Sequence, residues 1–125
     1  MTSSAKILNF HHAQLTIPVG AEDKARKFYC GVLGLKEIPK PDSLAGRGGF
    51  WLELGRFQVH VGTEDVEGRA ESKAHIAYEV VNIDDWEAKL KGADIAVTHC
   101  IQIPYYRRFE FRDPFGNRVE FLERI

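Results

Sequence analysis

The chain has 125 residues, of which 44% are hydrophobic and 28% charged, and its formal net charge at pH 7 is −1. This length suits one globular domain with its own core. A charge so near zero gives no electrostatic case for binding nucleic acid or an anionic membrane. No apolar run approaches the ~20 residues of a membrane span, and residues 1–6 lack the apolar segment of a signal peptide.

The first half of the chain shows strand patterns on both sides of a helical pattern. Residues 10–17 alternate, with apolar side chains on one face and His12 on the other. Residues 21–33 repeat apolar residues at helical spacing and stop before Gly34, which suits the position after a helix. Three further short strands are expected at residues 35–38, 50–54 and 56–62. Between the first two of them, the polar residues 39–49 predict a mobile loop.

Residues 63–73 are charged and without period, which makes them the best candidate for a linker. After them the order of patterns begins again. Residues 75–81 alternate as a strand, and a short helix should follow through about Lys91, capped by Asn82 or Asp84. The remaining expected strands are residues 95–98, 108–112 and 118–123. The last two flank a turn at residues 113–117 and form a hairpin.

The two halves therefore repeat one unit: strand, helix and three strands. This repeat predicts an α+β fold made of two βαβββ modules, at about residues 7–62 and 74–125, in one domain. Each module should curve its sheet into a cup, with the helices outside. In the repeat, His12 corresponds to His75, and His60 corresponds to Glu120.

These four residues share one feature, which is that each lies on the polar face of a strand whose other face is apolar. Three imidazoles and one carboxylate are a sufficient ligand set for a divalent transition metal. A single histidine on a strand is more often an ordinary hydrogen-bonded residue, so the metal prediction depends on the joint pattern. The predicted metal ligands are His12, His60, His75 and Glu120.

Several other side chains are candidates for contact with a small-molecule substrate. Arg108 could reach the cavity and pair with an anionic substrate, pair with Glu110, or remain solvated. Trp51 is expected in the cavity wall or the core. Tyr105 and Tyr106 lie in an aromatic loop before the final hairpin. The two cysteines in the sequence are too few for a disulfide framework, so we expect a protein of the reducing cytoplasm.

Taken together, these segments resemble the vicinal oxygen chelate superfamily, also called the glyoxalase, bleomycin resistance and extradiol dioxygenase superfamily. The segments that carry the resemblance are residues 12–17 (HAQLTI), 25–35 (ARKFYCGVLGL), 51–55 (WLELG), 59–61 (VHV), 75–80 (HIAYEV) and 113–120 (DPFGNRVE). The resemblance implies that His12, His75 and Glu120 occupy the three ligand positions common in the superfamily. It implies that His60 occupies a fourth position, where the glyoxalase I branch has a glutamate.

The resemblance implies a metal-dependent enzyme of lyase, isomerase or dioxygenase type that holds Zn, Ni, Mn, Fe or Co. Four protein ligands on an octahedral ion would leave two positions for a substrate with adjacent oxygens, and Glu120 would act as base. A different reading is a metal-free drug-binding or resistance protein, in which Trp51, Tyr105 and Tyr106 enclose an aromatic or cationic compound. A third is a fold whose site has been lost. We expect a homodimer, with cups that pair either within a chain or across the dimer.

Overall fold

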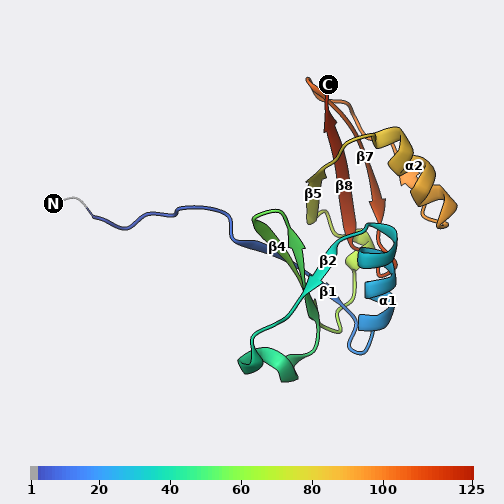
Figure 1. Ribbon diagram of the computed structural model, residues 1–125. Coiled ribbons are helices and arrows are strands. Elements are labelled where there is room, and N and C mark those ends of the chain that lie inside the picture. The colour runs from blue at the N-terminus through green and yellow to red at the C-terminus, as the bar shows by residue number, and fades with distance from the viewer. Residues whose placement is uncertain (1–2) are drawn as a thin grey trace.

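The computed structural model describes residues 3–125, and its strands form two four-stranded sheets (Figure 1). The first sheet, in the order β1-β4-β3-β2, contains β1 (His12–Ile17), β2 (Lys36–Ile38), β3 (Phe50–Leu54) and β4 (Phe57–Thr63). The second, in the order β5-β8-β7-β6, contains β5 (His75–Glu79), β6 (Val97–Thr98), β7 (Tyr106–Arg112) and β8 (Arg118–Arg124). The edge strands β1 and β5 run parallel to their neighbours, β4 and β8. The predicted α+β fold of two βαβββ modules is confirmed.

The helix of the first module is only partly α-helical. It begins as α1 (Glu22–Arg26) and continues as a π-helix, η1 (Lys27–Val32), before Gly34 ends it at a φ of +78°. The sequence predicted the span and the terminating glycine but not the wider π turns. Residues 39–49, expected as a loop, contain a 3-10 helix, η2 (Asp42–Arg47). Within residues 3–125, no helix has the length and apolar character needed to cross a bilayer.

The helix of the second module, α2 (Ile83–Gly92), does not use the predicted cap. Neither Asn82 nor Asp84 caps it with a side chain, and Asn82 has a φ of +58°. The carboxylate of Glu123 does so instead, because it accepts hydrogen bonds from the backbone N–H groups of Asn82 (2.7 Å) and Ile83 (3.1 Å). The unpaired N–H groups at the helix start are thus satisfied from β8.

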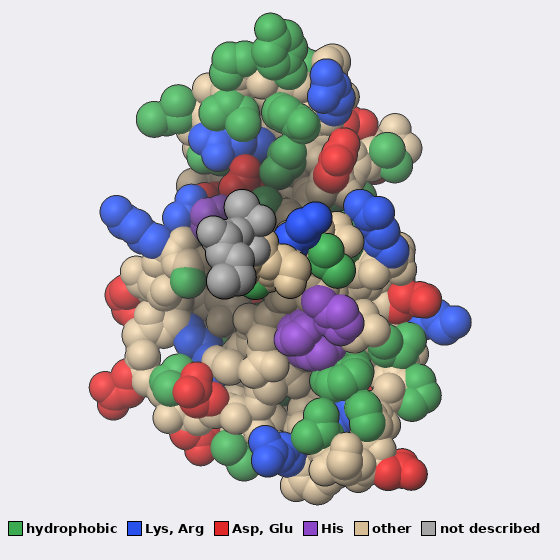
Figure 2. All heavy atoms as spheres, turned by 90° about the vertical axis from the view of Figure 1, so that its left-hand side faces the viewer, with side chains coloured by type: hydrophobic (Ala, Val, Ile, Leu, Met, Phe, Trp, Pro, Cys, Tyr) green, Lys and Arg blue, Asp and Glu red, His purple; other side chains and the backbone are tan. Residues whose placement is uncertain are grey.

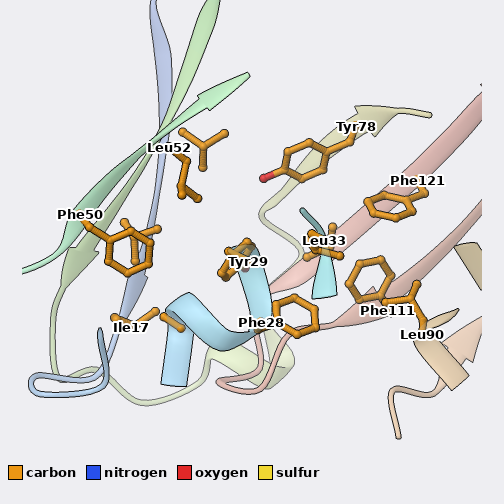
Figure 3. Close-up of a cluster of buried hydrophobic side chains, with 14 of the residues drawn as sticks. Ile17, Phe28, Tyr29, Leu33, Phe50, Leu52, Tyr78, Leu90, Phe111 and Phe121 are labelled. Atoms are coloured by element: carbon orange, nitrogen blue, oxygen red, sulfur yellow. The ribbon is translucent and has the colours of Figure 1, made fainter. Parts of the chain in front are cut away.

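The core is continuous from one sheet to the other, with the first helix between them (Figure 3). Phe50 and Leu52 point from the first sheet toward Tyr29, while Phe111 and Phe121 approach from the second. All five are at most 3% exposed. Burial of each such side chain contributes about 1.5–3 kcal/mol, so the apolar faces of both sheets are turned inward and their polar faces outward.

The turn at Asp113 fastens the final hairpin to that helix. Asp113 is buried, and its Oδ1 accepts from the backbone N–H groups of Phe115 and Asn117, both at 2.9 Å. Its Oδ2 accepts from the hydroxyl of Tyr29 at 2.5 Å. Burial and the neighbouring negative charge of Asp113 raise the pKa of Tyr29 well above its usual value, so Tyr29 keeps the proton that it donates.

Residues 63–73, predicted as a linker, do connect the two sheets, but arginines hold them in place. Arg69, in the 3-10 helix η3 (Arg69–Glu71), donates to the backbone oxygen of Thr16 and to its hydroxyl, both at 3.1 Å. Arg112 donates to the backbone oxygens of Arg69 (3.1 Å) and Ser72 (2.9 Å). The connection between the two modules is therefore hydrogen-bonded at several points.

Candidate metal centre

The strand registers confirm the correspondence between the predicted ligands of the two modules. In the first sheet, His12 is paired with the residue two positions before His60. In the second, His75 is paired with the residue two positions before Glu120. Residues on one sheet face recur every second position, so each histidine shares the polar face with its diagonal neighbour. Each module therefore presents one pair of predicted ligands.

The pair in the second sheet is in direct contact. His75 Nε2 lies 3.0 Å from Glu120 Oε1, and Glu120 is only 7% exposed. His75 Nδ1 lies 2.9 Å from the backbone oxygen of Lys73, and since a carbonyl can only accept, Nδ1 carries a proton. In a neutral ring, Nε2 then turns a lone pair toward the carboxylate. Two acceptors this close require a cation between them, either a proton or a metal ion.

The spacing of these two atoms fits a metal ion. Ligand atoms about 2.1 Å from an ion and at right angles to each other are about 3.0 Å apart. The hydrogen bond from Nδ1 to the Lys73 backbone is of the kind that orients a histidine ligand. The donor set of His75 and Glu120 therefore fits one half of a metal site, and the orienting carbonyl is a feature that the sequence pattern did not identify.

Arg108 is the third member of this cluster. Its Nη1 donates to Glu120 Oε2 at 3.2 Å, while its Nε (2.9 Å) and Nη2 (2.5 Å) donate to the backbone oxygen of Ile101. Of the partners left open by the sequence, Glu110 is excluded as a contact, because it pairs with Arg118 at 2.8 Å. Arg108 thus stands beside a predicted metal ligand rather than free in solution.

The pair in the first sheet is stacked. The ring of His60 lies 3.9 Å from that of His12, at an interplanar angle of 16°, and 3.9 Å from that of Trp51 on its other side, at 2°. His60 is 5% exposed. Burial, followed by the positive charges of His12 and His11 in their protonated forms, lowers the pKa of His60 to about 4. Near neutral pH the His60 ring is therefore uncharged, as metal ligation requires.

The stack itself does not fit a shared ion. Imidazole binds a metal in the plane of its ring, and an ion in the plane of His12 would lie well outside the nearly parallel plane of His60. In addition, His60 Nε2 is hydrogen-bonded to Gln58 Oε1 (2.8 Å), and His12 Nδ1 to His11 Nδ1 (2.9 Å). One ring must leave the stack before both could bind the same ion. Sequence reasoning missed the roles of Gln58 and His11, because they depend on side-chain packing.

Within residues 3–125 of one chain, no three His, Cys, Asp or Glu side chains form a group that could hold a metal ion. Of the two arrangements that the sequence left open, a single chain does not bring the four predicted ligands together, and they form two separate pairs. The space-filling view shows histidines at two separate places on the face of the molecule that is turned toward the viewer (Figure 2). A cavity of about 480 Å³ lies between the edge strands β1 and β5 and is lined by Gln14, Thr16 and His75.

The predicted aromatic contacts are divided between the two sheets. Trp51 lies on the polar face of the first sheet, stacked on His60. Tyr105 is 71% exposed, with a φ of +71°, and Tyr106 is the first residue of β7. Tyr106 is four residues along that strand from the partner of Glu120, which corresponds to about 13 Å. Within one chain, Trp51 and the two tyrosines therefore belong to different halves of the candidate site.

A comparison with family models decides the affiliation of the chain. The model of the Glyoxalase/Bleomycin resistance protein/Dioxygenase superfamily matches residues 9–121. The chain belongs to this superfamily. A glyoxalase family protein from Bacillus anthracis is 39% identical, with a TM-score of 0.89, and the match covers 98% of this chain and 100% of that one. No curated protein matches.

Two less similar solved structures share the fold of this chain. The fosfomycin resistance protein FosX from Listeria monocytogenes, complexed with Mn(II) and sulfate, is 14% identical with a TM-score of 0.77, covering 96% of this chain and 93% of its own. TnmS3, an antibiotic binding protein from Streptomyces sp. CB03234, is 18% identical with a TM-score of 0.71, covering 96% and 100%. The same fold thus occurs in a protein complexed with Mn(II) and in an antibiotic binding protein.

Proposed function

We propose that this superfamily member is a metal-dependent enzyme that acts on a small molecule through two adjacent oxygens. The observation that supports this most strongly is the contact between His75 Nε2 and Glu120 Oε1 at 3.0 Å, in which the proton on Nδ1 leaves two acceptors facing each other. A divalent cation satisfies both atoms. Such an ion, when bound, would polarise the substrate oxygens and stabilise negative charge that develops on them.

The complete site combines the two pairs from different copies of the chain. His75 and Glu120 hold the ion from the second sheet of one copy, His12 from the first sheet of the other, and His60 joins only if it leaves its stack. Exposed apolar residues close to His12 support association between copies, since Ile7 is 97% and Phe10 67% exposed. The proposed assembly is a homodimer with two shared sites.

The chain's own groups then have separate tasks. Glu120 is the candidate base when it is released from the ion, and its Oε1 is then the oxygen that can take a proton, because Oε2 is bonded to Arg108. Trp51 offers a flat aromatic surface against planar parts of a substrate. Tyr105 and Tyr106 are candidate contacts at the rim of the second sheet. Arg108 can bind an anionic group of the substrate only by giving up one of its present partners.

A second function is favoured by the stack of His12, His60 and Trp51, whose rings do not direct their nitrogens toward one ion. In this alternative the protein binds an aromatic or cationic drug without metal, and the stack forms one wall of the binding site. The protein would then act as a resistance protein that binds the compound, and not as an enzyme.

Elemental analysis of protein purified without a histidine tag or chelator distinguishes the two functions. The enzyme proposal expects near-stoichiometric divalent metal, which His75→Ala should remove and the control His99→Ala should retain. A screen of metals against methylglyoxal–thiol adducts, catechols and epoxide antibiotics would then identify the reaction. If wild-type protein takes up none of Zn, Ni, Mn, Fe or Co, the enzyme proposal is rejected in favour of metal-free binding.

A further inference from the structure

Arg108 connects Glu120 to the segment between β6 and β7, residues 99–105. Its side chain is 20% exposed, and its guanidinium makes hydrogen bonds in two directions. One direction is Glu120 Oε2, and the other is the backbone oxygen of Ile101, which receives both Nε and Nη2. No other side chain of the described residues joins these two points.

The same segment is fastened to Arg108 a second time. The side-chain amide of Gln102 donates to the backbone oxygens of Cys100 (3.0 Å) and Arg108 (3.2 Å). Apart from these contacts the segment exposes large apolar side chains, with Ile101 at 86% and Tyr105 at 71% exposure. Its ends are also bonded, since His99 Nε2 lies 3.3 Å from Glu87 Oε2 and the Ile125 N–H donates to the backbone oxygen of Tyr105 at 2.9 Å. Between these ends, its position beside Glu120 depends on the hydrogen bonds of Arg108 and Gln102 rather than on burial in the core.

The contact also determines which oxygen of Glu120 is available. Oε1 faces His75, whereas Oε2 is engaged by Arg108 Nη1. As long as that bond holds, Glu120 can offer only Oε1 to an ion at the position between it and His75. A carboxylate without this restraint can bind a metal through both oxygens, which would occupy a position that the substrate needs.

We propose that Arg108 is a positioning residue that keeps Glu120 a one-oxygen ligand and fixes residues 99–105 beside it. This inference rests on the proposed function for its metal part, while the part concerning residues 99–105 holds for the metal-free chain. The alternative role, charge neutralisation of a buried carboxylate, would be met equally by lysine. Lysine keeps the charge but lacks the planar fork that reaches Glu120 and Ile101 together.

The test uses Arg108→Lys and Arg108→Met, with Arg118→Lys as a matched control. Arg118 pairs with Glu110 in the same sheet, and its side chain is 23% exposed, close to the 20% of Arg108. The first readout is the backbone NMR order parameter of residues 99–105 in metal-free protein, which reports motion whether or not an amide is hydrogen-bonded. In both Arg108 variants it should fall from about 0.85 toward about 0.6, and in the control it should not.

The second readout is the visible absorption of the Co(II)-loaded protein, which depends on the number and geometry of the ligands. Arg108→Met should change the bands, because a second Glu120 oxygen would replace one of the other ligands, and Arg108→Lys should not restore them. Wild-type order parameters and spectra in Arg108→Lys would overturn the inference, because charge alone would then suffice. If wild-type protein binds no Co(II), the proposed function fails, and the order parameters still decide whether Arg108 holds the segment.

Discussion

The two modules carry equivalent pairs of side chains in chemically different states. In the second sheet, His75 and Glu120 meet edge to edge at 3.0 Å, with a lone pair and a carboxylate that require a cation between them. In the first sheet, His12 and His60 lie face to face at 3.9 Å and need no cation. Equivalent positions in a repeat therefore fix where a side chain lies but not what it binds. The neighbours decide the difference, since Trp51 stacks on the first pair and Arg108 is bonded to the second.

The largest expected effect concerns metal affinity. Glu120→Gln keeps the shape of the side chain but removes the charge, so the affinity for a divalent ion should fall by well over a hundredfold. This exceeds the 10–100-fold that is typical for loss of an outer-shell group. His60→Gln should lower the affinity less than about tenfold, because His60 is stacked. Calorimetric titration with Zn(II) or Mn(II) measures both, and equal losses in the two variants would remove the proposed difference between the pairs.

The next effect is a pH dependence that belongs to the first pair. His60 has a pKa of about 4 in the folded protein and about 6.5 when unfolded. Between these values the unfolded chain binds more protons, so the free energy of unfolding should fall as the pH drops from about 6.5 to 4, by about 3 kcal/mol. His60→Gln should remove that part of the slope. Urea unfolding of metal-free protein at several pH values tests this, and parallel curves for the two proteins would contradict it.

A smaller effect should come from the contact that joins the two halves. Tyr29→Phe removes the hydroxyl that donates to buried Asp113 at 2.5 Å. A lost hydrogen bond to a charged group costs about 1.5–3 kcal/mol of the free energy of unfolding. The metal affinity of the folded variant should stay unchanged, because Tyr29 lies on the core side of both sheets. A normal stability of this variant would show that the Asp113 turn holds itself together.

Local sequence patterns predicted the positions of the four candidate ligands. The period of two along a strand placed all four on polar faces. The internal repeat correctly matched His12 with His75 and His60 with Glu120. These features depend only on neighbours within about ten residues or on the order of elements. The same holds for the turn at residues 113–117 and for the glycine that ends the first helix.

What the sequence could not predict depends on contacts between distant segments. The stack on His60 requires the register that sets Trp51 of β3 opposite His60 of β4. The cap of α2 comes from Glu123, which lies 40 residues from Ile83. Whether four ligands converge depends on how two sheets are packed, and no local pattern encodes that distance. Only the three-dimensional structure therefore shows that the four predicted ligands form two separate pairs within one chain.

The central claim is that the two pairs join across two copies of the chain to hold one ion. A mixture of two broken variants tests it directly: His12→Ala, which damages the first sheet, and His75→Ala with Glu120→Ala, which damages the second. In a mixed dimer with shared sites, one site contains both intact sheets and the other contains both damaged ones. After joint refolding, random pairing predicts that about a quarter of the wild-type metal-binding capacity returns, although neither variant binds metal alone. No recovery in a mixture shown to contain mixed dimers, with wild type binding normally, would contradict the account and assign each site to a single chain.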